Sequence, residues 1–459
     1  MMAVQHASQI SSRSKLSIAV LFGLFFVSAQ SNAESSTHSY DALPSTTLYS
    51  LANKGGVTDA AAWSQYQAGA ASSSVVDSAI RGGADSTEAY VLNTLLEQAQ
   101  ASGNTELLAL LSSATTDEEA ARLARTITPD RSGANVYAVL QSQELFANAI
   151  KKRTRDNILG IPAQSNFWVS ALGNDQTSYV TSDGANRYDG FNSSSAGAAF
   201  GFDKILASGS LVGLAFSHQY IETGSRMSTS SSEIGTFQAA VYGQTMWQDV
   251  NFSGRGIIGR GAHKMTRTIE GGSSFAGHDN ADGRTHSTTT AFQLDMSYPL
   301  YVSSFSIVPV MSASYNTVML DGYSEDYVRE YNNNGVLTKS TGSAAALVYD
   351  TQFYDELLLG VGLELGHTWF TGIGAIHTRL GGHVNYDTLD KDLTVTARLA
   401  SGGDSFTVKA NSRENIRYQS YLDMMLETDG RFSYSLGVQY DWDDTSKNAM
   451  AYGRAIYSF

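Results

Sequence analysis

The stretch "FSYSLGVQYDW", residues 432–442, alternates between two kinds of side chain at every position. One set is aliphatic or aromatic, with aromatic members near both ends, and the other set is small or polar. Because successive side chains of a β-strand point to opposite faces, this period of two predicts a strand. One face of that strand is apolar and the other is polar.

The same period recurs between residues 161 and 459. "LLLGVGLELG" (357–366) and "IHTRLGGHVNY" (376–386) repeat it clearly. We expect twelve strands of about 10 to 15 residues, whereas an ordinary strand has about five or six. They are expected near residues 166–175, 190–203, 211–222, 234–247, 250–263, 286–299, 304–318, 354–366, 372–386, 414–428, 432–442 and 449–459.

The connections between these strands alternate in length. Short links include "WQD", "YVSS" and "TDGR", whereas most others are long and polar, such as 264–285, 319–353 and 387–413. A soluble sandwich also alternates apolar and polar positions, but its strands are shorter. Long strands, alternating connections and an even strand number are typical of a bacterial outer-membrane barrel. The predicted fold class is therefore an all-β membrane barrel of about twelve antiparallel strands.

Residues 34–160 follow a helical period instead. Helices are predicted over 86–101, with Ser86 as the candidate N-cap, and over the following segments 104–113 and 116–125. The longest predicted helix covers residues 133–156. Its apolar stripe and its basic C-terminal end, which complements the helix dipole, contain Val136, Leu140, Ile150, Lys151, Lys152 and Arg153.

The N-terminus has the pattern of an export signal. Arg13 and Lys15 precede the apolar run 16–29, and the small residues of "SNA" (31–33) suit a signal peptidase. The run of about 13 apolar residues is shorter than the roughly 20 of a spanning helix, although an uncleaved anchor is the alternative. The expected division is a signal peptide (1–33), a short helical segment (34–131), a helical linker (132–160) and a barrel (161–459).

Composition excludes several classes of function. The chain has no cysteine, which rules out disulfides and thiolate metal sites. A net charge of −14 argues against a nucleic-acid partner. "GGDSF" (402–406) lacks the histidine base of an esterase, and His377 and His383 are about 20 Å apart on one strand. We expect no catalytic residue, metal or cofactor; a protease at the outer rim is the remaining enzymatic alternative.

Four further motifs carry a resemblance. They are "DGYSEDY" (321–327), "DELLLGVGLEL" (355–365), "VTARLASGGDSFTVKA" (395–410) and "AYGRAIYSF" (451–459). Over residues 155–459 the chain resembles the translocator domain of autotransporters, the type V secretion proteins of Gram-negative outer membranes. The resemblance implies a monomer among outer-membrane lipid and lipopolysaccharide, exported by the Sec machinery and inserted by periplasmic chaperones and the barrel assembly machinery. Tyr457 and Phe459 resemble that machinery's C-terminal signal.

The resemblance also implies that the helix before the first strand lies in the barrel lumen. Its basic end would meet acidic side chains of the wall, unless basic wall residues pair with those acids instead. The polar residues expected to face the lumen are Arg255, Asp295, Glu364, Arg379, Arg417, Asp423, Asp441 and Arg454. Some autotransporters cleave themselves in this helix at an Asn-Asn bond, but in this chain Ala149 follows Asn148.

Three hypotheses for function remain open. The first is an autotransporter-type barrel that translocates or displays its own short N-terminal segment at the cell surface. The second is a plugged structural or porin-like barrel without secreted cargo. The third is an adhesin that acts through the long loops 264–285, 319–353 and 387–413.

Overall fold

The computed structural model describes residues 74–158, 165–272, 278–331, 337–428 and 430–459. The chain divides into two compact units, Met1–Ser45 and Thr46–Phe459, and every described residue belongs to the second unit. The predicted signal peptide and the predicted segment up to residue 73 lie outside the described residues.

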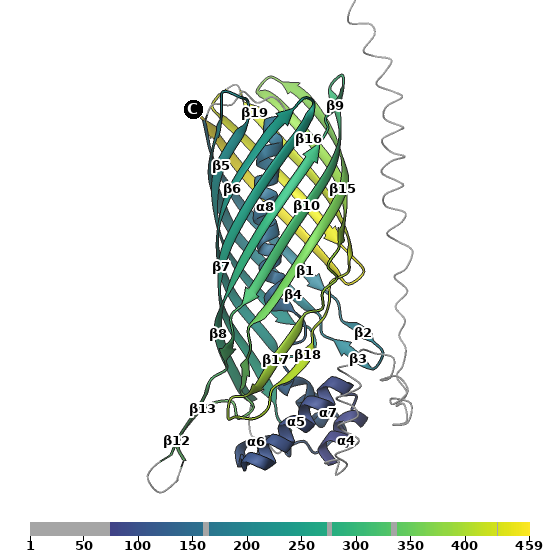
Figure 1. Ribbon diagram of the computed structural model, residues 1–459, viewed down its shortest axis with the longest axis vertical. Coiled ribbons are helices and arrows are strands. Elements are labelled where there is room, and N and C mark those ends of the chain that lie inside the picture. The colour runs from purple at the N-terminus through teal and green to yellow at the C-terminus, as the bar shows by residue number, and fades with distance from the viewer. Residues whose placement is uncertain (1–73, 159–164, 273–277, 332–336, 429) are drawn as a thin grey trace, which may run out of the picture. The chain divides into compact units, whose positions relative to one another are not determined.

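Twelve long strands form one closed antiparallel barrel, as the sequence predicted (Figure 1). Successive strands of the series are paired, and its first and last members, β15 and β10, also pair with each other. The series is β15 (Gln352–Thr371), β16 (Gly374–Asp387), β19 (Ile416–Thr428), β20 (Phe432–Trp442), β21 (Ser446–Ser458), β1 (Ser165–Ser178), β4 (Phe191–Ile205), β5 (Leu211–Ser225), β6 (Ser230–Trp247), β7 (Val250–Glu270), β8 (His278–Ser297) and β10 (Phe305–Leu320).

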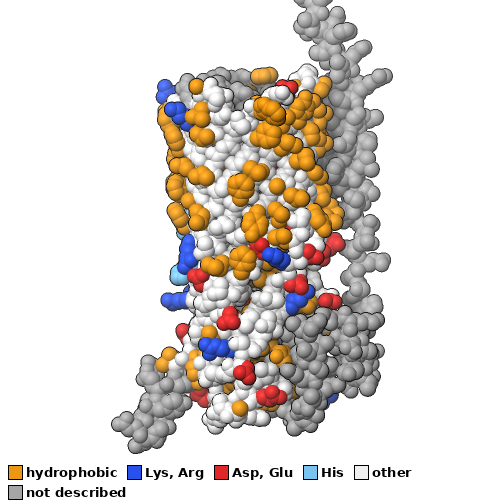
Figure 2. All heavy atoms as spheres, viewed as in Figure 1, with side chains coloured by type: hydrophobic (Ala, Val, Ile, Leu, Met, Phe, Trp, Pro, Cys, Tyr) orange, Lys and Arg blue, Asp and Glu red, His pale blue; other side chains and the backbone are white. Residues whose placement is uncertain are grey.

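The period of two sorts the side chains between the outer wall and the lumen. On β20, Leu436 and Val438 are 70% and 55% exposed, whereas Ser435 and Gln439 between the apolar positions are buried. The same sorting on the other strands places apolar side chains in a band around one half of the outer wall (Figure 2). A polar interior behind an apolar outer band is the arrangement that a bilayer requires.

The two ends of the barrel differ. Short turns join β4 to β5, β6 to β7, β15 to β16 and β19 to β20 at one end, which we call the turn end. The long connections β1–β4, β10–β15 and β16–β19 lie at the other end, which we call the loop end. Several strands extend farther toward the loop end than predicted; β7, for example, continues to Glu270 instead of stopping at residue 263.

The connections, which the sequence predicted as loops, contain further short strands. Short pieces such as these have little periodicity of their own and are defined by their pairing. One four-stranded sheet runs in the order β11-β14-β17-β18. The short strands are β2 (Thr181–Asp183), β3 (Asn186–Tyr188), β9 (Leu300–Val302), β11 (Tyr323–Ser324), β12 (Tyr327–Tyr331), β13 (Leu337–Gly342), β14 (Leu347–Tyr349), β17 (Thr394–Leu399) and β18 (Phe406–Lys409).

Five helices precede the barrel within the described residues. They are α4 (Ser74–Arg81), α5 (Ser86–Ser102), α6 (Thr105–Leu111), α7 (Asp117–Ile127) and α8 (Ala134–Ile158). The N-cap of α5 is Asp85 and not Ser86, so that prediction was wrong by one residue. The Asp85 carboxylate accepts from the Glu88 amide and the Glu88 side chain accepts in turn from the Asp85 amide, which completes a capping box.

Helices α4–α7 and the sheet β11-β14-β17-β18 share one hydrophobic core at the loop end. We call these elements together the cap. Leu92 and Leu95 of α5 and Leu123 of α7 are fully buried in the same cluster as Leu347 and Leu399 of the sheet. The cap and the loop end are therefore packed as one body, with apolar contacts that neither could make alone.

Helix α8 runs through the barrel from the loop end to the turn end (Figure 1). Near its start, the Tyr137 hydroxyl donates to the Asn411 carbonyl, which lies in the β18–β19 connection. Near its end, Arg153 binds Asp203 on β4, shortly before the turn to β5. No helix in the described part of the chain is long and apolar enough to cross a membrane.

Candidate functional site: the lumen helix and its ionic contacts

Residues 151–155 of α8 contain four cations, and Thr154 is the one neutral residue among them. Each cation binds a carboxylate on a different strand of the wall. All eight side chains are at most 14% exposed. The helix turns through about 100° per residue, so neighbouring side chains point to different sides of the barrel. The pairs are Lys151 with Asp295 on β8 at 3.0 Å, Lys152 with Asp423 on β19 at 2.8 Å, Arg153 with Asp203 on β4 at 2.7 Å, and Arg155 with Glu364 on β15 at 2.7 Å.

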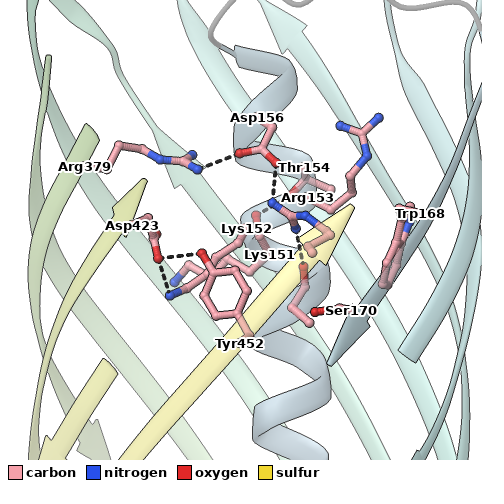
Figure 3. A network of polar contacts seen from close by, with 12 residues as sticks. Lys151, Lys152, Arg153, Thr154, Asp156, Trp168, Ser170, Arg379, Asp423 and Tyr452 are labelled. Atoms are coloured by element: carbon pink, nitrogen blue, oxygen red, sulfur yellow. Dashed lines mark hydrogen bonds and ion pairs between the residues drawn. The ribbon is translucent and has the colours of Figure 1, made fainter. Parts of the chain in front are cut away.

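Asp156 reverses the polarity of these contacts. Its carboxylate accepts from Arg379 on β16 at 2.6 Å (Figure 3). It also accepts from Arg454 on β21, and it is fully buried. Arg454 also donates to the carbonyl of Ala149 in α8. The end of α8 is thus tied to six strands: β4, β8, β15, β16, β19 and β21.

Neutral side chains complete two of the ion pairs. Tyr452 and Lys152 both donate to the same oxygen of Asp423, and the Lys152 Nζ lies 4.4 Å from the centre of the Tyr452 ring (Figure 3). Around Asp203, Tyr242 and Asn166 donate alongside Arg153, and the indole of Trp168 donates to the Tyr242 hydroxyl. Each carboxylate therefore has several donors, as a buried charge needs to offset its lost hydration.

The arrangement stabilises one position and one rotation of the helix. A buried ion pair adds little net stability by itself, but removal of one partner leaves a buried charge uncompensated and costs about 3–5 kcal/mol. A shift of α8 along the barrel by one turn would separate all six contacts together. The ionic contacts therefore fix the helix in register with the wall.

The structure brings together most of the polar residues that the sequence placed in the lumen. Asp295, Glu364 and Asp423 bind the helix, and Arg255 binds Asp295 alongside Lys151. Arg379 and Arg454 also bind the helix, although through Asp156 and not through the acids of the wall. Of the four candidate cations of the wall, only Arg255 forms an ion pair with one of the four candidate acids, as the alternative expectation had it.

Two of the candidate residues do not reach the basic end of α8. Arg417 binds Glu356 at 2.7 Å and Asp387 at 3.5 Å, toward the loop end. Asp441 is hydrogen-bonded to Gln439 and Asn448 on neighbouring positions of β20 and β21. Both side chains face the interior, but neither has an ion pair with a cation of α8 among the described residues.

The apolar candidates on α8 belong to two different clusters. Val136 and Leu140 lie in the core shared with the cap. Ile150 packs with Trp168, Ile257 and Ile456 on the inner wall. The helix is thus apolar where it meets the cap, and it is held by charges at the turn end.

Sequence reasoning missed Asp156 and Asp203 as members of the site. Asp203 occupies an inward position of the predicted strand 190–203, which alternation alone would have identified. Asp156 follows a run of cations, so the local charge pattern predicts a basic helix end that binds acids and not an acid that binds basic residues of the wall.

Tyr457 and Phe459 lie at the turn end, where β21 closes the barrel against β1. Tyr457 is directly opposite Phe167 on β1 and Phe432 on β20. The ring of Phe459 stacks on Tyr457 and lies 6.0 Å from that of Phe202. Their role as a signal for barrel assembly stays a prediction.

No cluster of three or more histidine, aspartate or glutamate side chains within the described ranges is arranged to hold a metal ion. His377 is hydrogen-bonded to Thr368 and Glu427, and His383 packs against the Tyr421 ring. These contacts place the two histidines among the structural polar groups of the wall.

A family model described as autotransporter β-domain matches residues 167–441. The chain belongs to the autotransporter β-domain family. Its barrel is a translocator barrel of the outer membrane, and the family is not known for enzymatic activity. Barrels of this family are generally assembled by outer-membrane machinery.

Solved structures of autotransporter barrels are similar to this chain. The translocator domain of NalP from Neisseria meningitidis has 11% sequence identity and a TM-score of 0.53, and the match covers 72% of this chain and 99% of that one. The β-domain of Bordetella BrkA has 13% identity and a TM-score of 0.40, covering 64% and 99%. Only the first likeness is close enough to support the fold. A comparison with curated proteins finds no match.

Proposed function

We propose that this autotransporter barrel places the part of its own chain before α8 outside the cell and keeps it there. The observation that carries the proposal is the direction of α8. The chain passes from the cap, through the lumen, to the turn end, where β1 begins. With the turn end in the periplasm, as the short turns of outer-membrane barrels are, the cap lies outside.

The polar lumen supports passage of a polypeptide through the barrel. Its wall presents carboxylates, guanidinium groups, hydroxyls and amides, which can replace water around an extended backbone. In the proposed mechanism the N-terminal segment crosses as a hairpin while the barrel assembles, without nucleotide hydrolysis. The six ionic contacts of α8 then stabilise the helix in its final position.

The proposed function requires partner proteins for export and for membrane insertion. The signal segment 1–33 would direct it to the Sec machinery, and periplasmic chaperones would deliver it to the barrel assembly machinery. The proposed domain division keeps residues 34–131 as the exported segment, 132–160 as the lumen linker and 161–459 as a barrel that acts as a monomer.

Surface labelling tests the proposed orientation cleanly, because the native chain has no cysteine. Ser102→Cys introduces one thiol at the exposed end of α5 in the cap, and Ser208→Cys introduces one at the exposed β4–β5 turn. A membrane-impermeant maleimide applied to intact cells should label Ser102→Cys only. Ser208→Cys should react only after the outer membrane is breached. Labelling of Ser208→Cys in place of Ser102→Cys would overturn the proposal.

A plugged structural barrel is the second candidate, and the shared core of cap and loop end favours it. The segment 74–131 contributes Leu92, Leu95 and Leu123 to this core, so it packs against the loop end of the barrel and is not a loosely attached extension. Protection of both engineered thiols on intact cells, together with low conductance of the purified barrel in planar bilayers, would favour this function.

A further inference from the structure

The outer wall of the barrel has an uneven charge distribution on its loop-end half. Only five Lys or Arg side chains of the twelve described barrel strands stand on the outer face, and three of them lie on the neighbouring strands β7 and β8. These three are Arg260, Lys264 and Arg284. The other two are Lys204 near the turn end and Lys447 on β21.

The three cations are close neighbours across the strand pair. Lys264 on β7 is directly opposite Arg284 on β8, which sets their Cα atoms about 5 Å apart. His286, also exposed, is two residues from Arg284 on the same face. Like charges opposite each other destabilise a sheet unless a counter-ion joins them. We call Arg260, Lys264, Arg284 and His286 the basic patch.

Three exposed carboxylates lie close to these cations, but only two of them form ion pairs with the patch. The third, Asp282, is two residues from Arg284 on the same face and accepts from the Thr266 hydroxyl. Arg260 binds Asp321 at 3.0 Å and Lys264 binds Glu233 at 3.5 Å, and all four of these side chains are at least 36% exposed. Exposed pairs of this kind contribute little and exchange readily. Among the described side chains, no carboxylate lies within ion-pair distance of Arg284.

The basic patch borders the apolar band of the wall. Along the outer face of β7, Arg260 is the next outward residue after Ile258, which is 59% exposed. On β8 the band begins at Phe292, which is 58% exposed. Figure 2 shows basic, histidine and acidic side chains together, directly beyond the hydrophobic band on the flank where β7 and β8 run in Figure 1.

A polar groove adjoins the patch. It has a volume of about 530 Å³, and Lys264 belongs to both features. Its other lining residues are hydroxyl, amide and carboxylate groups, including Asn192, Ser194, Glu222, Ser231 and Glu233. Such groups hydrogen-bond to the hydroxyls of a sugar, whereas the carboxylates would repel a phosphate. The groove and the patch therefore suit different parts of one ligand.

We propose that the basic patch and this groove bind lipopolysaccharide from the outer leaflet, the phosphates on Arg260, Lys264 and Arg284 and the adjoining sugars in the groove. A glycolipid with phosphates at the boundary of its acyl chains presents anionic, saccharide and apolar parts that match the cations, groove and apolar band of the wall. The site rests on the orientation proposed above, since it requires the loop end to face the outer leaflet.

The test uses the purified full-length protein in detergent and native mass spectrometry. The ligands are bis-phosphorylated lipid A, its dephosphorylated form and inorganic phosphate. The triple variant Arg260→Gln, Lys264→Gln, Arg284→Gln is compared with the control variant Lys204→Gln, Lys447→Gln, which removes the two outward cations elsewhere. Heat-modifiability on gels checks that each variant is folded.

Wild type and control should bind lipid A equally well, and the triple variant at least tenfold more weakly. Dephosphorylated lipid A should also bind wild type at least tenfold more weakly. Equal binding by the triple variant, an equal loss in the control, or tight binding of inorganic phosphate would overturn the site. The detergent titration does not depend on orientation, so a failure of binding and a failure of surface labelling are separate results.

Discussion

Val361 lies in the middle of β15 with its side chain 59% exposed on the outer wall. Its neighbours across the strands, Met311 and Val384, are apolar and exposed as well. An arginine at this position would place a charge among lipid chains. Val361→Arg should lower the free energy of unfolding by about 2–4 kcal/mol in lipid vesicles, as charged residues do near the midplane.

The measurement is a urea titration of the barrel in vesicles, with Val361→Leu as the control. Leucine keeps the outward side chain apolar and should leave the unfolding free energy within about 0.5 kcal/mol of wild type. An arginine variant as stable as wild type would remove Val361 from the lipid-facing surface.

Asp189, in the connection before β4, gives a pH dependence outside the membrane. Its carboxylate accepts from the amides of Met227 and Ser228 at 2.8 and 2.7 Å. Burial, and then the charge of Asp130, raise the pKa of Asp189 from 3.8 to about 6. Between about pH 4 and pH 6 this carboxyl is protonated in the folded state and ionised in the unfolded state. The free energy of unfolding therefore falls as pH rises from about 4 through about 6.

Asp130→Asn should remove part of this effect, because it removes the second cause of the raised pKa of Asp189. The variant should gain stability over wild type as pH rises through about 6, by roughly 1–2 kcal/mol at pH 7. Thermal unfolding between pH 4 and pH 8 measures the difference. Asp392→Asn, at an exposed pair with Lys409, is the control and should show no such trend.

At this scale the sequence predicts which side of the wall a residue faces, but not which partner it chooses. Alternation places Asp423, Arg379 and Asp441 inside. Whether an inward acid meets the helix depends on strand register and on the rotation of α8, and neither is encoded in one strand alone.

Among the elements, α8 is the one whose position depends most on charge. Among the pairs that the cations of α8 form with barrel strands, Arg153 and Asp203 are the most buried, at 3% and 0% side-chain exposure. Arg153→Ala and Asp203→Ala should each cost about 3–5 kcal/mol, because each leaves one buried charge alone. The double variant should cost clearly less than the sum of the two.

A double-mutant cycle on unfolding in vesicles measures this coupling. The exposed pair Arg81 and Asp117 in the cap, at 60% and 38% exposure, is the matched control and should couple by less than about 1 kcal/mol. Additive losses at Arg153 and Asp203 would show that the pair does not hold α8 in place.

Elements of the barrel were predictable because each long strand repeats its period over several residues. All twelve were located. Most of the larger errors lie at the loop end, where strands continue without an apolar outer face, but β15 also continues at the turn end to Thr371 instead of stopping at residue 366. Outside the bilayer, exposed positions are polar like the inner ones, so the alternation fades while the pairing continues. Strands such as β14 and β17 were missed because their three and six residues are specified by neighbours across the sheet.

For the molecule as a whole, the shared core predicts that the cap and the long connections lose structure together. Leu92→Asp puts a charge into this core at a fully buried position of α5 and should cost on the order of 3–5 kcal/mol. Hydrogen exchange should then become faster in α5 and α7 and equally in β14 and β17. Strands β19–β21 should keep their protection, because none of their buried residues belongs to the shared core, and β21 packs in the other cluster, around Ile150.

Ala101→Asp is the control, since it adds the same charge at an exposed position of the same helix. It should leave exchange unchanged. Faster exchange in α5 and α7 alone, with β14 and β17 still protected, would show that the cap is a separate domain that only rests on the barrel.

The architecture of the barrel follows from the sequence because it depends on local alternation and the lengths of connections. The cap does not, because its helices and strands are about 200 to 300 residues apart in the chain and meet only through tertiary packing. No short-range pattern relates Leu92 to Leu347 or Leu399.

The length of β7 has a consequence for reach. Its 21 residues correspond to roughly 70 Å along the strand, or roughly 50 Å in height at the usual tilt, of which an apolar band accounts for about 25 Å. About half of the height of the wall, on the loop-end side, thus lies outside the apolar band. In the proposed orientation it raises the cap clear of the lipid headgroups, so that a short segment of chain can meet antibodies, phages or other cells without a long passenger to extend it.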